Sequence, residues 1–426
     1  MKNITKIGIG ILLTVILIGG TTAQNITELE NFVGEHSVMH LTAWKAAALA
    51  MDKLDVEKGD NILVLTDAGY TSMIDGHTTE ECLDALIIAT GASPGKNNLF
   101  QLHRAYYQHL WFVFFDSKTK DCVYVEVDSK TLGKYLKNND VEGFKNLDDN
   151  EIFKIMAKEN IDPEKLLNNP EEWNKKVNAK VFGGNEFSIT TVSSVWANDA
   201  SNEFLKSAEL HNHICPGLSS GYLIVKYLEK EMPIENEKQS YKIYAAPSWC
   251  KDDAIQTILD TTVGKKGMYV VGLTKEQEKQ LPKGTAGIYF RCDTTTGICN
   301  GRVLTFNWNK AFKDCNMNSS WLQDWKTYKG WWTRYKMNLW MMDYTDNPGY
   351  LVGTAKEFTI NASRIGGGGD FTSAGVNPYV ELGLMSEENG GIKTEPEAES
   401  QPWIYALIGL LVIIAIGIAF YMKKNK

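Results

Sequence analysis

One short segment, His211-Asn212-His213-Ile214-Cys215-Pro216-Gly217, constrains the fold of this chain more than any other. Proline has a helix-like φ and no backbone N–H, so it is favoured at the first helical position. The segment therefore predicts a helix over Pro216–Glu231 with Cys215 as its N-cap. The amides and dipole of a helix start favour a thiolate, and imidazole and thiolate both bind transition metals. We predict that His211, His213 and Cys215 bind a metal, or that Cys215 acts as a nucleophile.

A second segment again places a cysteine just ahead of a helix. Cys250 precedes an amphipathic pattern that includes Asp253 and is predicted to end near Thr262. A loop with Gly264 and Lys265 follows. We expect Cys250 to complete the ligand set. Asp253 is expected to orient a ligand or to act as an acid or base.

These segments resemble the FmdE family, which is named after formylmethanofuran dehydrogenase, over about residues 200–310. That family has an H-x-H-x-C-P-G element, a cysteine three residues ahead of an Asp-Ala helix, and a Gly-Lys loop. The chain has Asp260-Thr261-Thr262 where the family usually has a further cysteine, and it lacks the Cys-x-x-Cys pairs of a C-terminal zinc ribbon. The resemblance implies a divalent transition metal, zinc in first place, and points to a methanogenic archaeon. The enzyme in the family's name works inside the cell, so its activity is not carried over.

The first half of the chain repeats this order. Cys82–Leu86 and Thr90–Leu99 are similar to the helix and Gly-Lys loop of the second half, and Glu35–His40 to Leu210–Cys215. We expect Gly95 and Lys96, like Gly264 and Lys265, to contact a cofactor. Hairpins are predicted at Trp111–Val127 and Ile288–Phe306.

The expected fold class is α+β, with two FmdE-like domains in tandem at residues 24–185 and 186–345. Each would pack helices on a mainly antiparallel sheet, and the domains would pair within the chain or in a homodimer. Between the hairpin of the first domain and the second domain, Leu132–Val177 is predicted to form short helices.

The first copy differs at the positions that carry the chemistry. Val38 replaces His213, His40 replaces Cys215, and Glu81 replaces Cys250. His36 and His40 are four residues apart, a spacing that places two ligands on one helix face. His36, His40 and Glu81 are therefore a possible second metal site. The alternative is that the first domain is only a structural partner.

Both ends of the chain indicate a membrane. Residues 1–23 have the pattern of a signal peptide, and residues 403–422 are apolar and long enough to span a bilayer. Lysines in the tail, residues 423–426, predict that the tail is cytoplasmic and that the bulk of a single-pass protein is extracytoplasmic. Residues 346–402 are predicted to form a stalk. The net charge of −8 argues against binding to nucleic acid.

Two further patterns leave alternatives open. Helical spacing predicts one stripe, which serves either in core packing or as a wall for a flat, pterin-like ligand; it consists of Trp321, Trp325, Tyr328, Trp332, Tyr335 and Leu339. The cysteine pairs Cys292–Cys299, Cys122–Cys299 and Cys215–Cys250 are each possible disulfides.

Three functions are compatible with these patterns. The first is a membrane-anchored protein that binds a transition metal or a metal-containing cofactor. The second is a thiol-dependent enzyme, and the third is a structural protein of the cell envelope whose sites are vestigial.

Overall fold

The computed structural model describes residues 20–70, 74, 77–366 and 369–386. The chain separates into two units, Met1–Val376 and Asn377–Lys426, and both sheets belong to the first. The first sheet consists of β1 (Ile62–Thr66), β2 (Leu99–Gln101), β3 (Trp111–Asp116), β4 (Asp121–Val127) and β5 (Phe153–Asn160). Its order is β2-β1-β3-β4-β5, and only the β1–β2 pair is parallel.

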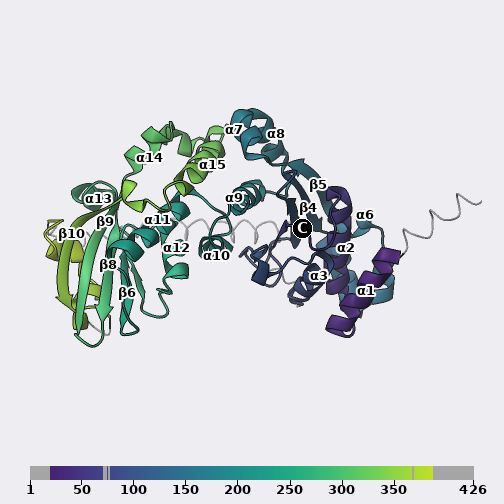
Figure 1. The fold of residues 1–426 in the computed structure, drawn as a ribbon, viewed down its shortest axis with the longest axis horizontal. Helices are drawn as coiled ribbons and strands as arrows, with labels where there is room; N and C mark the ends of the chain where they lie inside the picture. The colour runs from purple at the N-terminus through teal and green to yellow at the C-terminus, as the bar shows by residue number, and fades with distance from the viewer. Residues whose placement is uncertain (1–19, 71–73, 75–76, 367–368, 387–426) are drawn as a thin grey trace, which may run out of the picture. The chain divides into compact units, whose positions relative to one another are not determined.

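The second sheet has the same plan. It consists of β6 (Gln239–Ala245), β7 (Met268–Val270), β8 (Thr285–Asp293), β9 (Ile298–Phe306) and β10 (Val352–Asn361). Its order is β7-β6-β8-β9-β10, and β6–β7 is the parallel pair. Figure 1 shows β6, β8, β9 and β10 side by side, next to α11 and α12.

The helices before and after the first strand of each sheet also correspond. They are α2 (Val38–Leu54) and α3 (Glu81–Thr90) in the first half, and α11 (Pro216–Glu231) and α12 (Lys251–Ile258) in the second. Each half thus runs helix, strand, helix, and then the remaining strands of its sheet. The predicted α+β class with mainly antiparallel sheets is confirmed, and the two sheets are consistent with two domains.

The remaining helical elements join and cover these parts. They are α1 (Gly20–Val33), η1 (Pro94–Lys96), α4 (Ser129–Asn138), α5 (Val141–Lys145), α6 (Asp149–Ile152), α7 (Pro163–Asn168), α8 (Pro170–Ala179), α9 (Glu186–Ala197), α10 (Asn202–His211), α13 (Lys275–Gln280), α14 (Trp308–Asp314), η2 (Ser319–Gln323), α15 (Lys329–Met342), η3 (Pro348–Tyr350), η4 (Ala362–Arg364), η5 (Asp370–Thr372) and α16 (Pro378–Glu381).

The first sheet is buried on both faces. Alternate residues, such as Phe112 and Phe114, pack with α2 and α3, while Val113 and Phe115 face a second core. That second core also contains residues of α9, α10, α11 and α15. Strands covered on both sides are continuously apolar, which explains the run Trp111–Phe115. A third core lies between α11, α15 and the second sheet.

The two predicted hairpins are present as β3–β4 and β8–β9. The second hairpin is closed by a Cys292–Cys299 disulfide, one of the three predicted pairings. The other two are wrong, because Cys122, Cys215 and Cys250 are free thiols.

Other boundaries differ from the prediction. Residues assigned to the start of the stalk form β10, which pairs with β9 along its length. A strand, β5, lies within the segment predicted as short helices. The helix after Cys250 ends at Ile258 rather than near Thr262. Both missed strands are edge strands with polar side chains, so neither has a continuous apolar run.

The aromatic tract is not a single helix. Trp321 lies in η2, and α15 begins only at Lys329. The Asp324 carboxylate accepts hydrogen bonds from the amides of Lys326 and Thr327 (3.2 and 3.1 Å). This local turn competes with helix formation and interrupts the predicted stripe.

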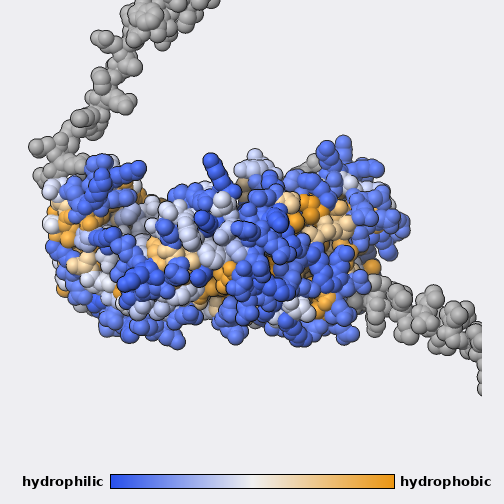
Figure 2. All heavy atoms as spheres, turned by 90° about the horizontal axis from the view of Figure 1, so that it is seen from above, coloured by the Kyte–Doolittle hydropathy of each residue, from blue (hydrophilic) through white to orange (hydrophobic). Residues whose placement is uncertain are grey.

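In the described part of the chain, no helix combines the length and apolar character needed to span a bilayer. The predicted membrane span, the cytoplasmic tail and residues 387–402 of the predicted stalk lie outside the described residues, as do residues 1–19 of the predicted signal peptide. On the face drawn in Figure 2, hydrophilic side chains cover most of the surface and hydrophobic ones form separate small areas.

Candidate metal centre

The two histidines converge because the chain reverses direction between them. His211 is the last residue of α10, and Asn212 follows in the left-handed conformation with φ 57°. Asparagine tolerates this conformation better than most residues, and it commonly ends helices. The turn brings the rings of His211 and His213 to 4.4 Å between centroids.

The next residues fix the loop against the second core. The Ile214 amide donates to Thr191 Oγ1 of α9 (3.2 Å), and Asn338 Nδ2 of α15 donates to the Ile214 carbonyl (3.3 Å). Cys215 is then the N-cap of α11, as predicted, but its side chain makes no capping hydrogen bond. Its thiol instead faces the histidines.

Three potential ligand atoms are gathered at this point. One ligand atom from each of His211, His213 and Cys215 lies within 4.8 Å of the others. His211 Nε2 is 3.7 Å from Cys215 Sγ. Zn–S and Zn–N distances of about 2.3 and 2.0 Å imply an S···N separation of about 3.5 Å around a tetrahedral ion. The donor types and their spacing fit zinc.

Cys250, the fourth predicted ligand, lies nearby at the start of α12, but among the described residues its sulfur is not one of the ligand atoms gathered within 4.8 Å. Its interactions with Cys215 and His211 lower the pKa of its thiol. Gly217 permits this approach, since a Cβ at that position would lie 2.9 Å from Cys250 Cβ and 3.2 Å from its Sγ. The Gly217 of the sequence motif is therefore explained by contact between α11 and α12.

Each of the two histidines has a side-chain partner at its Nδ1 atom. His211 Nδ1 lies 2.7 Å from Asp253 Oδ2, and Gln256 Nε2 donates to Asp253 Oδ1 at 3.0 Å. His213 Nδ1 lies 3.1 Å from Asn212 Oδ1. Carboxylate and amide oxygens at Nδ1 leave Nε2 free as a ligand atom, which is the usual arrangement around histidine-bound metals.

The pKa values of the two histidines are shifted in opposite directions. Burial opposes protonation of His211, but hydrogen bonds to Asp253 and Cys250 outweigh it and raise its pKa to about 9. Burial lowers the pKa of His213 to about 3, with the charges of His211 and Arg104 adding to the effect. The site therefore combines an imidazolium with a neutral imidazole.

The pKa values of the two thiols are shifted in opposite directions. The hydrogen bond from Cys215 and that from His211 lower the pKa of Cys250 to about 4. The same contact with Cys250, together with burial, raises the pKa of Cys215. These shifts favour the thiolate on Cys250, not on Cys215 as predicted from its place at a helix start.

A buried lysine supports the start of α12. Lys251 is fully buried; its Nζ contacts both carboxylate oxygens of Asp252 at 2.6 and 2.8 Å and lies 4.1 Å from the centre of the Trp249 ring. Asp252 in turn accepts from the Trp249 amide at 3.0 Å. This ion pair fixes the turn that carries Cys250.

The first half has a different arrangement at the equivalent place. Ser37, not His40, is the N-cap of α2 and so corresponds to Cys215. Its hydroxyl donates to Glu81, the residue that replaces Cys250. His40 Nδ1 is 3.9 Å from Glu81, and His36 pairs with Glu30. His36 precedes the helix, so the predicted shared helix face of His36 and His40 is wrong.

The lysines of the two Gly-Lys steps bond to neighbouring residues of their own loops. Lys265 Nζ pairs with Asp260, and Lys96 Nζ donates to the Gly91 carbonyl at 2.7 Å. Both lysines are exposed. A Cβ at Gly264 would have no neighbour within 4 Å, and one at Gly95 would meet only the Ser93 hydroxyl at 3.8 Å.

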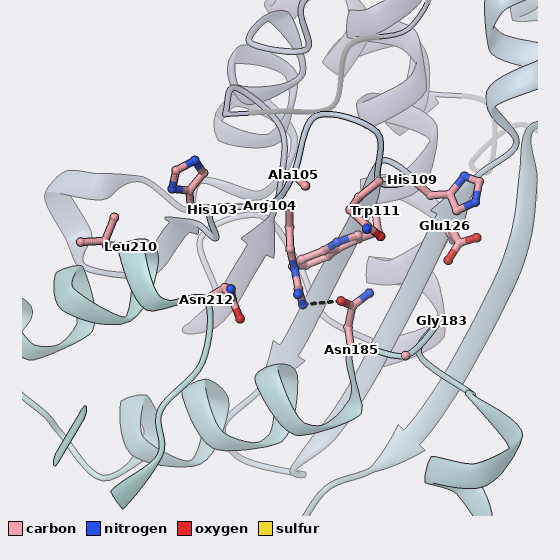
Figure 3. Close-up of a pocket in the computed structure, with 12 residues that line it drawn as sticks. His103, Arg104, Ala105, His109, Trp111, Glu126, Gly183, Asn185, Leu210 and Asn212 are labelled. Carbon is pink, nitrogen blue, oxygen red and sulfur yellow. Dashed lines mark hydrogen bonds between the residues drawn. The ribbon is translucent and has the colours of Figure 1, made fainter. Parts of the chain in front are cut away.

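A pocket of about 460 Å³ adjoins the metal centre (Figure 3). Its wall includes Arg104 and Asn212, neither of which was predicted as a site residue. Asn212 lies inside the motif, but asparagine at a variable position of a motif does not indicate a ligand pocket. No motif marks Arg104, so only the tertiary structure identifies it.

Comparison with known proteins agrees with the motif. Residues 210–286 match the family model described as FmdE, Molybdenum formylmethanofuran dehydrogenase operon. A search of curated proteins gave no match. The matched residues contain the four predicted ligands, Asp253 and the strands β6 and β7. The part of the chain that carries the candidate metal centre is therefore similar to the FmdE family.

Proposed function

We propose that this protein binds one divalent transition metal ion, zinc in first place, through His211, His213, Cys215 and Cys250. The observation that carries the proposal is the gathering of three ligand atoms within 4.8 Å, with His211 held by Asp253 at its other nitrogen. Two imidazoles and two thiols form a donor set typical of tetrahedral zinc.

The test is the metal content and metal affinity of the full chain. We expect one zinc per chain. Cys215→Ser and Cys250→Ser should each weaken zinc binding by more than the loss of about 10–100-fold that is typical when a residue hydrogen-bonded to a ligand is replaced. Cys315→Ser is the matched control, since Cys315 is a buried free thiol of the third core. Stoichiometric zinc of unchanged affinity in both site variants would contradict the proposal.

A thiol-dependent enzyme is the second candidate. The observation in its favour is the contact between a Cys250 thiolate and a protonated His211, whose pKa values lie near 4 and 9. Such a pair is a nucleophile at neutral pH. A metal-free protein in which Cys250 is alkylated much faster than Cys315 would favour this candidate, and Cys250 rather than Cys215 would be the nucleophile.

We further propose that the two halves are tandem FmdE-like domains and that the protein is anchored outside the cytoplasm. The common strand order of the two sheets supports the first part. The Cys292–Cys299 disulfide supports the second, because disulfides persist in oxidising compartments. Membrane fractionation with protease treatment of intact cells tests the location. Recovery of the whole chain in the soluble fraction would overturn it.

A further inference from the structure

We propose that the pocket beside the metal centre binds a small molecule that carries a carboxylate or phosphate group, and that Arg104 receives this group. The pocket has a volume of about 460 Å³, within the range of ligand sites of about 300–1,000 Å³. The inference deepens the proposed metal-binding function and rests on it for the role of the bound molecule, a substrate or ligand presented to the metal centre.

The charge of Arg104 is incompletely compensated. Its guanidinium donates to Asn185 Oδ1 and to Ser188 Oγ (3.2 Å), both neutral acceptors. Its Nε is buried and has no hydrogen-bond partner among the described residues. Burial lowers the pKa of Arg104, and the charge of Asp67 opposes this only in part. A half-buried guanidinium with no ion-pair partner among the described residues is costly, and a carboxylate or phosphate is the group that its planar fork binds best.

The rest of the pocket wall leaves room for an anion beside Arg104. Neutral donors and imidazoles accompany Arg104, and the backbone of Gly183 and Gly184 closes one side. Figure 3 shows Arg104 extending to Asn185, with Asn212 on one side and His109 and Glu126 on the other. Glu126 is already balanced, because Lys154 Nζ and the Tyr124 hydroxyl lie 3.2 and 2.9 Å from its carboxylate oxygens. The anionic end of a ligand is therefore expected on the Arg104 side.

Hydrogen bonds link the pocket directly to the candidate metal centre. Asn212 lines the pocket and hydrogen-bonds to His213 Nδ1 at 3.1 Å. Glu209 lies near the end of α10, just before Asn212. Its carboxylate accepts a hydrogen bond from the Gln101 amide (3.1 Å), and its backbone carbonyl accepts one from the His103 amide (2.8 Å). The loop that carries Arg104 and the helix end that carries His211 are thus held together. A ligand on Arg104 would lie next to the residue that orients His213.

The experiment is calorimetric titration of the full chain with acetate and with inorganic phosphate, in metal-free and zinc-loaded forms, with chloride as a blank. We expect saturable binding of at least one of the two anions. Arg104→Gln should weaken it at least tenfold, and Asn185→Asp should do the same by placing a carboxylate against Arg104. Arg302→Gln, which removes an arginine paired with Glu357 on the second sheet, should leave it unchanged.

Each outcome decides between the two proposals. Saturable binding that is lost in Arg104→Gln and Asn185→Asp supports the pocket, and the anion bound more tightly identifies the ligand class. A zinc-loaded protein that binds neither anion overturns the pocket and leaves the metal centre standing. Anion binding by a protein that binds no zinc supports the pocket and overturns the metal centre. If Arg104→Gln fails to fold, Asn185→Asp decides, and unchanged affinity in that variant overturns the proposal.

Discussion

At the scale of single residues, the geometry of the candidate metal centre depends on residues that are not candidate ligands. Asp253 holds His211, Asn212 turns the chain between the histidines, and Gly217 admits Cys250. These residues set the distances between ligand atoms, which a ligand substitution alone does not test.

Asp253→Asn tests the orientation of His211. The amide keeps the size of the side chain but removes the charge that raises the pKa of His211 and fixes its Nδ1. We expect zinc affinity to fall by about 10–100-fold, as is typical when an outer carboxylate is lost. Competition with a chromophoric chelator measures it. Asp260→Asn, on an exposed carboxylate that pairs with Lys265, is the control and should have no effect.

Gly217→Ala tests the close approach of α11 and α12. The added methyl group would lie 2.9 Å from Cys250 Cβ, so Cys250 must move. We expect weaker zinc binding and a loss of about 1–3 kcal/mol in the unfolding free energy of the metal-free protein. Gly264→Ala, with no atom within 4 Å, should change neither quantity. Equal behaviour of the two variants in chelator competition and urea unfolding would refute this explanation of Gly217.

At the scale of elements, each half places a long helix against a short one at the start of its sheet. In the second half Gly221 of α11 lies against the backbone of Lys251, where a Cβ would be 2.3 Å from the carbonyl oxygen. The helices therefore cross with their backbones close together, and the N-termini of both lie at the metal centre.

The β8–β9 hairpin offers a separate test at this scale. Its disulfide closes a short loop, because Cys292 and Cys299 are seven residues apart. By the chain-entropy relation, such a cross-link stabilises the folded state by about 2 kcal/mol. The double variant Cys292→Ser/Cys299→Ser should lose about this amount in urea unfolding while keeping its zinc. Loss of zinc with unchanged stability would show that the hairpin acts on the metal centre instead.

At the scale of the whole first unit, one core joins the two halves. Tyr335 of α15 is fully buried in the second core, and its hydroxyl lies 2.7 Å from Ser194 Oγ of α9. Val113 of the first sheet and Leu218 of α11 belong to the same core. The two sheets are therefore expected to unfold together.

Tyr335→Ala tests this coupling. We expect a loss of about 3–5 kcal/mol, the usual cost of removing a large buried aromatic side chain. Hydrogen exchange should accelerate in β3 and in α11 alike. Tyr106→Ala, at a tyrosine that is 67% exposed, is the control. Faster exchange in only one half would show that the halves are independent.

The sequence by itself determined the local features of this protein. Pro216 fixed the start of α11, the apolar runs fixed the two hairpins, and the H-x-H-x-C-P-G segment identified three candidate ligands, because each signal lies within a short stretch of the chain. Local signals could not determine contacts between distant elements. Edge strands β5 and β10 have little apolar character, and their place depends on the neighbours that they pair with. The thiolate on Cys250 arises from its contacts with Cys215 and His211, and Arg104 reaches the pocket only through the packing of the first sheet on α9 and α10. Charge and proximity across the chain are properties of the tertiary structure, and they decided the chemistry of the site.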